Sequence, residues 1–417
     1  MARVWIVNPF DPLPGAPEQP GRYTSLARLL RAAGHDLTWW TATFSHRFKD
    51  HLERAPIDEA SRREGIDVRW IDAPPYRHNV GLRRLWSHRT WALRMEAEAA
   101  RRTSVSPPHV VIASNPPPEG AAATARLARR CGAALVVDVQ DIWVGNFRQL
   151  LPGVVRWAWP ALLRPWIRAN QESFAVADAV VGVAGAYVDE ARRYGRRDVR
   201  RAVVPIGIDL SGFDRAAASG RCLLGAKRPG EIWSIYSGSY SRSYDVRTVA
   251  NVAATIVSRV DHVRFIFSGT GALESEIRER LAGLPRIDFL GFAPFEDWAA
   301  TLRQCDIGWN AIKPEALIWF PNKIFYYWAA GLAVANSIPG ECAEWVTRTG
   351  TGVNYQNDNV ESAVAAFLTL SKDPAHLENA KCASRRAAVE RWDRARLYRS
   401  YLDLVSELAD GRHAGNW

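Results

Sequence analysis

Short apolar segments alternate with amphipathic helical patterns along almost the whole chain, and this alternation predicts the fold class. In the first half, the apolar segments predict buried strands at residues 4–7, 37–41, 68–71, 109–114, 134–138, 179–183 and 202–205. In the second half they predict strands at residues 232–237, 263–267, 287–290, 307–310 and 333–335. Strands that alternate with helices form parallel sheets covered by helices on both faces. We therefore expect an α/β protein with two doubly wound, Rossmann-like domains.

A Pro/Gly turn at residues 205–209 separates the two halves of the pattern. It predicts an N-terminal domain at residues 1–207 and a C-terminal domain at residues 208–390, a division that suits a chain of 417 residues. The final segment, residues 391–417, has a helical pattern from 391 to 410. Because ligands of doubly wound sheets bind at the carboxyl ends of the strands, we expect the functional site in a cleft between the two domains.

Composition narrows the class of protein. The chain has no run of about 20 apolar residues, so no membrane-spanning helix is predicted. Its first apolar segment is too short for a signal peptide. The five cysteines are odd in number and widely spaced, which argues against both a disulfide framework and a zinc site. These observations favour the reducing environment of the cytoplasm.

The net charge of +10 favours anionic partners such as nucleotide diphosphates or acidic lipid surfaces, although a genome rich in arginine codons also explains it. No nucleic-acid-reading motif is recognisable, so we do not expect a nucleic-acid partner. The chain also contains 18 tryptophans, a residue enriched at interfaces between apolar and aqueous surroundings. Tryptophan and arginine are interleaved at helical spacing in residues 81–102 and 143–166. This pattern predicts peripheral contact with a membrane, and packing between helices is the alternative.

The loop after the first predicted strand is long and rich in proline, and it lacks the Gly-x-Gly-x-x-Gly pattern of dinucleotide-binding proteins. It places Gly21 and Arg22 at the N-terminus of the first helix, where free backbone N–H groups and the helix dipole favour an anion. A plain loop that leads into a helix is the alternative.

The first loop of the second half has the composition of a phosphate-binding loop. Small residues allow a phosphate to approach the backbone closely, and an arginine can pair with a diphosphate. The residues concerned are Ser237, Gly238, Ser239 and Arg242. Gly269 and Gly271 follow the next strand and offer a second close approach to a nucleotide, although a lone Gly-x-Gly is weak evidence.

Residues 320–331 are the most informative segment. Pro321 suits the start of a helix, where its missing N–H group costs nothing. The free N–H groups of the first turn, together with Lys323, would then face a phosphate. A buried amphipathic helix is the alternative, because several residues of the segment are strongly apolar.

Several motifs occur in an order and spacing that resemble the group 1 glycosyltransferases of family 4, which have the GT-B fold. The resemblance extends over nearly the whole chain. The motifs lie at residues 34–38, 177–184, 205–210, 289–292, 306–308 and 321–331. The opening at residues 8–15 further resembles members that build bacterial surface polysaccharides.

This resemblance implies a function and a distribution of roles. Such enzymes transfer a sugar from a nucleotide sugar with retention of configuration and without a metal or other cofactor. The C-terminal domain would bind the donor, and the N-terminal domain would bind the acceptor, which is a surface glycan, a lipid-linked glycan or a small natural product. The final helix would cross back to the N-terminal domain. Ser237, Gly238, Ser239 and Arg242 would form the diphosphate loop, Gly269 and Gly271 would lie beside the base, and Pro321, Asn322 and Lys323 would lie beside the diphosphate.

One departure from the family pattern concerns the donor ribose. The family usually carries two glutamates separated by seven residues, and here Ile318 and Tyr326 occupy those positions. A tyrosine offers a single hydroxyl in place of a bidentate carboxylate. Either the ribose is held differently, or the donor is unusual, or catalysis is impaired. A non-catalytic partner of a glycosyltransferase therefore remains an alternative, as does a nucleotide-sugar epimerase of similar fold.

Candidate acceptor residues follow the strands of the N-terminal domain. Asp141 comes just after the predicted strand at residues 134–138 and is the candidate to orient or deprotonate the acceptor hydroxyl, with a helix cap as the alternative. Asp138 and Asp141 together could suggest a divalent metal, but no third ligand is apparent, so no metal is expected. His46 follows the second strand and could line the acceptor pocket, unless it is an exposed loop histidine without a role.

Overall fold

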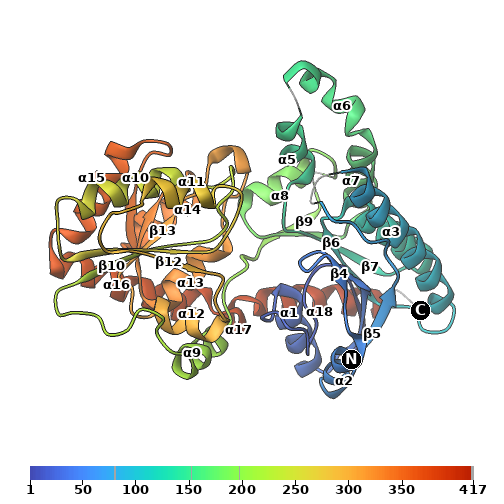
Figure 1. Cartoon of the computed structure of the whole chain (residues 1–417). Helices are drawn as coiled ribbons and strands as arrows, with labels where there is room; N and C mark the ends of the chain where they lie inside the picture. Colours follow the sequence, from blue (N-terminus) through green and yellow to red (C-terminus); the bar gives the residue numbers. More distant parts are fainter. Residues whose placement is uncertain (79–80, 152, 197, 415–417) are drawn as a thin grey trace. The chain divides into compact units, whose positions relative to one another are not determined.

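The computed structural model describes residues 1–78, 81–151, 153–196 and 198–414, and it divides into two compact units. The N-terminal unit contains Met1–Ile206 and the chain from Leu397 onward, and the C-terminal unit contains Gly207–Arg396. Each unit is a parallel sheet with helices on both faces (Figure 1), which confirms the predicted fold class. The last three residues of the expected final segment lie outside the described residues.

The N-terminal unit is built on a seven-stranded parallel sheet of order β5-β2-β1-β6-β7-β8-β9. Its strands are β1 (Arg3–Val7), β2 (Asp36–Ala42), β5 (Ile66–Ile71), β6 (Val110–Asn115), β7 (Ala134–Val139), β8 (Ala179–Gly182) and β9 (Arg200–Val203). A small hairpin pairs β3 (Phe44–Ser45) with β4 (Asp50–His51). The helices are α1 (Arg22–Ala32), α2 (Arg54–Arg63), α3 (Leu82–Thr103), α4 (Pro118–Cys131), α5 (Trp143–Leu150), α6 (Trp159–Leu162), α7 (Arg164–Val176), α8 (Gly185–Arg192) and α18 (Arg399–Ala414), with a 3₁₀ helix at Gly153–Ala158.

Side-chain spacing explains this architecture. In β1, Val4 and Ile6 point into one core cluster, whereas the alternate residue Trp5 packs its ring 5.2 Å from that of Trp40. In α1, the residues Tyr23, Leu26, Ala27 and Leu30 are fully buried and recur at the i, i+3, i+4, i+7 spacing of one helix face. The sheet is therefore covered by helices whose apolar faces match it.

The C-terminal unit has a six-stranded parallel sheet of order β12-β11-β10-β13-β14-β15. Its strands are β10 (Ile232–Ser237), β11 (Val263–Ser268), β12 (Ile287–Gly291), β13 (Ile307–Asn310), β14 (Ala333–Asn336) and β15 (Gly352–Asn354). The helices are α9 (Leu210–Ser219), α10 (Val246–Val257), α11 (Glu274–Arg280), α12 (Phe295–Leu302), α13 (Asn322–Ala330), α14 (Glu341–Thr349), α15 (Val360–Ser371), α16 (Pro374–Ala387) and α17 (Arg394–Leu397), with a 3₁₀ helix at Pro314–Ala316.

The single helix expected at residues 391–410 is wrong. A π-helical turn at Ala388–Trp392 ends before Asp393, and α17 and α18 follow as separate helices. The break has a local cause, because the extended backbone at Asp393 forms a parallel bridge with Ile208. The Ile208 N–H group donates to the Trp392 carbonyl, and the Arg394 N–H group donates to the Ile208 carbonyl. Within the described ranges, no helix is both long and apolar enough to cross a membrane.

Candidate functional site

The predicted phosphate-binding loop, residues 237–242, follows β10. Two aromatic side chains hold the start of this loop. The Ser237 N–H group donates to the Tyr327 hydroxyl at 3.0 Å, and the Trp298 indole N–H donates to Ser237 Oγ at 3.0 Å. Tyr327 comes from α13 and Trp298 from α12, so two helices hold this end of the loop. Neither residue is predictable from the sequence, because a single aromatic residue in an amphipathic helix has the pattern of a core residue.

The predicted glycines bring two loops into backbone contact. The Gly238 N–H group donates to the Ser268 carbonyl, and the Tyr240 N–H group donates to the Thr270 carbonyl, both at 2.9 Å. A Cβ atom on Gly269 would lie 2.0 Å from the Gly238 carbonyl oxygen, and one on Gly271 would lie 2.6 Å from the Tyr240 carbonyl oxygen. The close backbone contact therefore explains why both positions are glycine. Their location beside a base stays a prediction.

The side-chain ammonium group of Lys323 is buried beneath the loop at residues 237–242. Its Nζ atom is buried and has no hydrogen-bond partner among the described residues. It lies 4.5 Å and 4.6 Å from the ring centres of Tyr236 and Tyr244, and a Cβ atom on Gly238 would lie 3.1 Å from it. Burial lowers its pKa to about 7. Because a buried ammonium without a counter-charge is unfavourable, this side chain is poised to receive an anion that enters over Gly238.

The other predicted donor residues surround this point less closely. Pro321 is buried directly before α13, Asn322 is exposed as the first residue of that helix, and the side chain of Ser239 is exposed while its carbonyl accepts from the Tyr236 hydroxyl at 2.7 Å. Arg242 is exposed and forms no ion pair within the part of the chain that the structure describes. The loop at residues 237–242 and the first turn of α13 therefore come together mainly at three of the predicted residues, Ser237, Gly238 and Lys323.

Tyr326, at the position of the family's second glutamate, is half-buried in a cluster of rings. Its ring centre lies 5.2 Å from that of Trp298, 6.0 Å from Phe295 and 6.1 Å from Phe213. Trp298 also donates a hydrogen bond to Ser237, so it connects Tyr326 to the predicted phosphate-binding loop. The aromatic cluster, whose rings meet Tyr326 edge to face or tilted, provides an apolar surface at this position in place of a carboxylate.

The N-terminus of α1 is not free to bind a ligand, which corrects the expectation for Gly21 and Arg22. The Tyr23 N–H group donates to the Asp11 carboxylate at 2.9 Å, and a Cβ atom on Gly21 would lie 2.5 Å from that carboxylate. Arg22 is buried and binds both oxygens of Asp138 at 2.8 Å and 3.1 Å. The protein's own carboxylates therefore satisfy the positive end of the helix and its arginine.

Asp141 has the environment expected of a proton acceptor. It follows β7 and accepts hydrogen bonds at Oδ1 from the Ile142 N–H group at 2.8 Å and from the Asn146 amide at 2.7 Å. Burial raises its pKa to about 6, although these bonds and Arg84 act in the opposite direction. Because a catalytic base works best with a pKa near the operating pH, this shift suits such a role. Asp138 lies three residues earlier but is engaged by Arg22.

His46 belongs to a cluster of polar and aromatic groups and is not an exposed loop residue. Its Nδ1 atom lies 2.6 Å from the Tyr76 hydroxyl and 3.2 Å from Lys49 Nζ. Burial, together with nearby Arg84 and Lys49, lowers its pKa to about 4, so the imidazole is neutral at pH 7. Arg84 hydrogen-bonds Tyr76 and is attracted by Asp141, so the cluster extends from His46 to Asp141. The described residues contain no group of three or more His, Cys, Asp or Glu side chains arranged to hold a metal ion.

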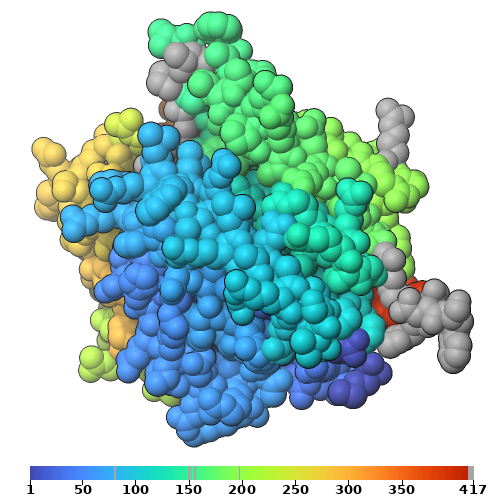
Figure 2. Space-filling view, turned by 90° about the vertical axis from the view of Figure 1, so that its right-hand side faces the viewer, coloured from blue at the N-terminus to red at the C-terminus, as the bar shows by residue number. Residues whose placement is uncertain are grey.

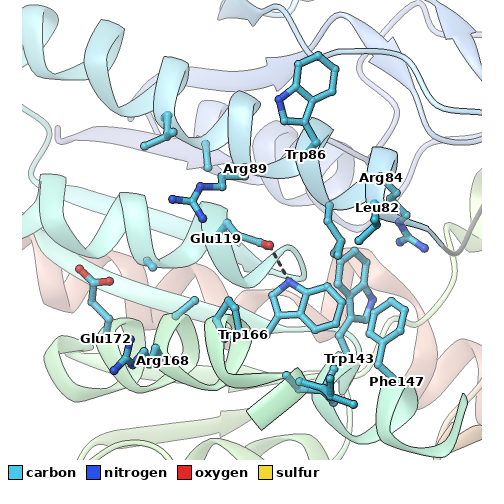
Figure 3. A pocket seen from close by; sticks show the side chains of 18 of the residues that line it. Leu82, Arg84, Trp86, Arg89, Glu119, Trp143, Phe147, Trp166, Arg168 and Glu172 are labelled. Atoms are coloured by element: carbon cyan, nitrogen blue, oxygen red, sulfur yellow. Dashed lines mark hydrogen bonds between the residues drawn. The ribbon is translucent and has the colours of Figure 1, made fainter. Parts of the chain in front are cut away.

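A cavity of about 790 Å³ adjoins this cluster in the N-terminal unit. Its wall includes Arg84 and Trp143, and the guanidinium of Arg84 lies 4.4 Å from the Trp143 ring centre. The two segments that interleave tryptophan and arginine in the sequence both line this cavity (Figure 3). The structure thus brings them together on one surface.

Known proteins with the same architecture include enzymes of sugar transfer. Among solved structures, HepE from Anabaena in complex with UDP and glucose has 14% identity and a TM-score of 0.66, covering 98% of this chain and 100% of that one. Sucrose-phosphate synthase from Thermosynechococcus elongatus has 14% identity and a TM-score of 0.73, covering 99% and 100%. A Listeria monocytogenes protein described as a UDP-N-acetylglucosamine 2-epimerase has 11% identity and a TM-score of 0.56, covering 98% and 97%. A comparison with curated proteins finds no match.

The two doubly wound units and these structural neighbours define the GT-B fold. Residues 20–207 match the family described as a glycosyl transferase 4-like domain, and residues 233–373 match the family described as glycosyl transferases group 1. The chain therefore belongs to the family 4-like, group 1 glycosyltransferases, as the sequence motifs predicted.

Proposed function

We propose that the chain transfers a sugar from a nucleoside diphosphate sugar to an acceptor hydroxyl, with retention of configuration and without a metal. The observation that carries this proposal is the buried Lys323 ammonium, which has no hydrogen-bond partner among the described residues and lies under the Gly238 backbone. A diphosphate is the anion that such a cation and a glycine loop recognise together. HepE, which shares the fold, forms a complex with UDP, and this supports a nucleotide donor.

The C-terminal unit would hold the donor. Lys323 would neutralise the diphosphate, while the exposed Arg242 would contact its oxygens. Pro321 and Asn322 would lie beside the same group at the start of α13. We further propose that the ribose contacts the Tyr326 hydroxyl and the ring of Trp298, because the aromatic cluster occupies the position of the absent glutamate.

The N-terminal unit would hold the acceptor. In the reaction, the bond between the anomeric carbon and the diphosphate oxygen breaks, and the acceptor oxygen bonds to the same carbon. The nucleoside diphosphate leaves, and the hydroxyl proton passes to the Asp141 carboxylate or to the leaving diphosphate. Asp141 orients the hydroxyl in either case, and neutral His46 offers it a further hydrogen bond.

The cysteine content and the surface tryptophans and arginines favour a place in the cytoplasm, at the inner face of a membrane. There the acceptor would be a growing surface glycan, a lipid-linked glycan or a natural product.

A thermal-shift screen of the full chain against UDP, GDP, ADP, CDP and dTDP tests the donor site, because a ligand of the folded state raises the melting temperature. We expect one base to give a clear shift, and we expect Lys323→Met and Arg242→Ala to remove it. Lys372→Met changes an exposed lysine of the same unit and serves as the control. If no nucleotide shifts the midpoint at millimolar concentration, the donor proposal fails. Binding without sugar transfer would favour the non-catalytic partner instead.

A further inference from the structure

The cavity of the N-terminal unit is predominantly apolar and opens to the surface. It lies among α3, α4, α5, α6 and α7, and its volume of about 790 Å³ is in the range of sites for small organic ligands. Leu85, Ala92, Ala122, Leu163 and Ala169 are among the residues that line it. The nucleotide site described above lies in the other unit, so this cavity requires a different ligand.

The mouth of the cavity is surrounded by exposed apolar side chains. Leu82, Trp86, Leu93 and Leu162 all line the cavity, yet they are 83%, 59%, 55% and 52% exposed. Val154 and Trp157 do not line the cavity but are also exposed, on the 3₁₀ helix that directly precedes α6. Exposed apolar surface of this extent marks a place where another apolar phase or molecule is bound.

Positive charge surrounds the same mouth. Arg89 and Arg168 line the cavity and are exposed, and Arg156 and Arg164 are exposed on the neighbouring segment. By contrast, Arg126 is paired with Glu96 and Glu172. Apolar anchors flanked by arginines match the interface of an anionic lipid leaflet, whereas a free ligand enclosed by the cavity would not require an exposed apolar rim. Figure 2 shows this side of the N-terminal unit, with α3 in light blue beside the green segment that contains α6 and α7.

Arg84 connects the cavity wall to the candidate acceptor site. Arg84 and Trp143 belong to the cavity wall, and Arg84 is attracted by both Asp141 and Glu119. Glu119 also lines the cavity, and its Oε1 atom accepts from the Trp166 indole at 2.6 Å (Figure 3). Its Oε2 atom is buried without a hydrogen-bond partner among the residues that the structure describes. A buried carboxyl oxygen of this kind is suited to a polar headgroup at the inner end of an otherwise apolar cavity.

From these observations we propose that the cavity holds the apolar chain of a lipid acceptor that stays anchored in an anionic membrane leaflet. The headgroup hydroxyl reaches Asp141 past Arg84, and the chain runs outward between Leu82, Trp86 and Leu93. This inference rests on the proposed function, since it names the class of acceptor for the same enzyme, but chain binding is measurable without any nucleotide.

The first test measures the affinity of the full chain for hexyl, octyl and decyl glucoside, each below its micelle concentration, by calorimetry. Each buried methylene contributes about 0.8 kcal/mol, so two more methylenes should tighten binding roughly tenfold or more. Ala122→Trp, which fills the cavity, should abolish this dependence on chain length. If Ala122→Trp fails to fold, Leu93→Glu at the exposed mouth replaces it, and Leu368→Glu, an exposed leucine of the other unit, is the control. Affinity that does not depend on chain length overturns the proposal.

The second test measures whether the chain binds an anionic membrane, in which the proposed lipid acceptor would be anchored. The chain should sediment with vesicles of phosphatidylglycerol and phosphatidylcholine, and at least fivefold less with vesicles of phosphatidylcholine alone. Trp86→Glu and Arg168→Glu should each reduce the sedimented fraction, whereas Arg259→Glu, an exposed arginine of the other unit, should not. Binding of glucosides without binding of anionic vesicles overturns the membrane anchor.

The thermal shift with the same five nucleoside diphosphates is recorded for the same samples. A chain-length dependence without a shift by any of them rejects the donor proposal and leaves the lipid cavity, and the converse result rejects the lipid cavity alone.

Discussion

Arg22 and Lys323 occupy equivalent positions in the sequence, each in the first turn of a helix that follows a loop containing proline, but the structure gives them opposite surroundings. Arg22 is buried in the N-terminal unit, where its Nε and Nη2 atoms donate to Asp138 and its Nη1 atom donates to the Val204 carbonyl at 2.7 Å. Lys323 is buried in the C-terminal unit with its ammonium facing two tyrosine rings and the Gly238 backbone. The first charge is compensated within the fold, whereas the Lys323 ammonium has no hydrogen-bond partner among the described residues, which is the basis of the proposal that it binds the donor.

This difference separates a charge that stabilises the fold from one that we propose binds a ligand. A buried ion pair mainly makes its own removal costly, because a lost partner leaves an uncompensated charge. A buried charge without a counter-ion lowers the stability of the empty protein and is retained where binding requires it. Substitutions at the two positions should therefore change stability in opposite directions.

The largest effect is expected for Arg22→Met, which leaves Asp138 buried and unpaired. The N-terminal unit should lose about 3–5 kcal/mol of unfolding free energy, measured by urea denaturation. Arg22→Met combined with Asp138→Leu removes both charges and should recover a large part of the loss. A loss below about 1 kcal/mol for the single variant would mean that the pair has no structural role.

The next effect concerns Asp141, the carboxylate that follows β7. Asp141→Asn should lower kcat about a hundredfold while leaving the affinity for UDP unchanged, because a positioned proton acceptor contributes on that order. Its pKa of about 6 means that the carboxylate is charged above pH 6, so kcat of the natural chain should rise as the pH increases through 6. Asp36→Asn, an exposed aspartate of the same unit, is the control for the steady-state assay. An unchanged kcat in Asp141→Asn would leave Asp141 as a helix cap only.

Lys323→Met is expected to change binding and stability in opposite directions. UDP affinity should fall roughly 30-fold, since a hydrogen bond to a charged group contributes about 2 kcal/mol. Without nucleotide, the variant should unfold at higher urea concentration than the natural chain, because the uncompensated ammonium is gone. Lys372→Met should change neither quantity, and a destabilised Lys323→Met would indicate a structural lysine.

A smaller effect concerns pH. The free lysine has a pKa of about 7, and a bound diphosphate favours its protonated form. Nucleotide affinity should therefore fall as the pH rises above 7, and the total fall should not exceed the roughly 30-fold loss expected for Lys323→Met. The affinity of Lys323→Met, measured in the same titration series from pH 7 to 9, should not vary with pH.

The smallest effect is expected for Trp298→Phe, which keeps a ring beside Tyr326 but removes the hydrogen bond to Ser237. Nucleotide binding should weaken about fivefold, because one hydrogen bond contributes about 1 kcal/mol. Trp345→Phe changes a half-buried tryptophan elsewhere in the same unit and provides the matched control.

Much of the fold could be predicted from the sequence, because strands buried on both faces are continuous apolar runs. The predicted strand at residues 232–237 has the observed bounds of β10, and most other strands agree within two residues. The edge strand β15 (Gly352–Asn354) was missed because it is short and carries no apolar run. The break at Asp393 was missed because it depends on a bridge to Ile208, which is distant in the sequence.

The candidate site could be predicted only in part, because a sequence pattern shows where a charge lies and not what compensates it. Lys323 and Gly238 come together as the motifs suggested. Arg22 does not face a ligand, since its partner Asp138 is more than a hundred residues away. Tyr76, which contacts His46, lies on a segment without any motif, and Arg84 lies on a segment whose pattern predicted membrane contact and gave no sign of its attraction to Asp141.

The central claim, that Lys323 is the buried cation that receives the donor diphosphate, is tested most directly by counting protons. The nucleoside diphosphate that the thermal-shift screen selects is titrated into the full chain by calorimetry at pH 8, in two buffers with different enthalpies of ionisation. Because Lys323 with a pKa of about 7 is mostly neutral at pH 8, binding should take up roughly two-thirds of a proton per nucleotide, and Lys323→Met should take up none. Binding without proton uptake in the natural chain, or equal uptake in the variant, would contradict the account.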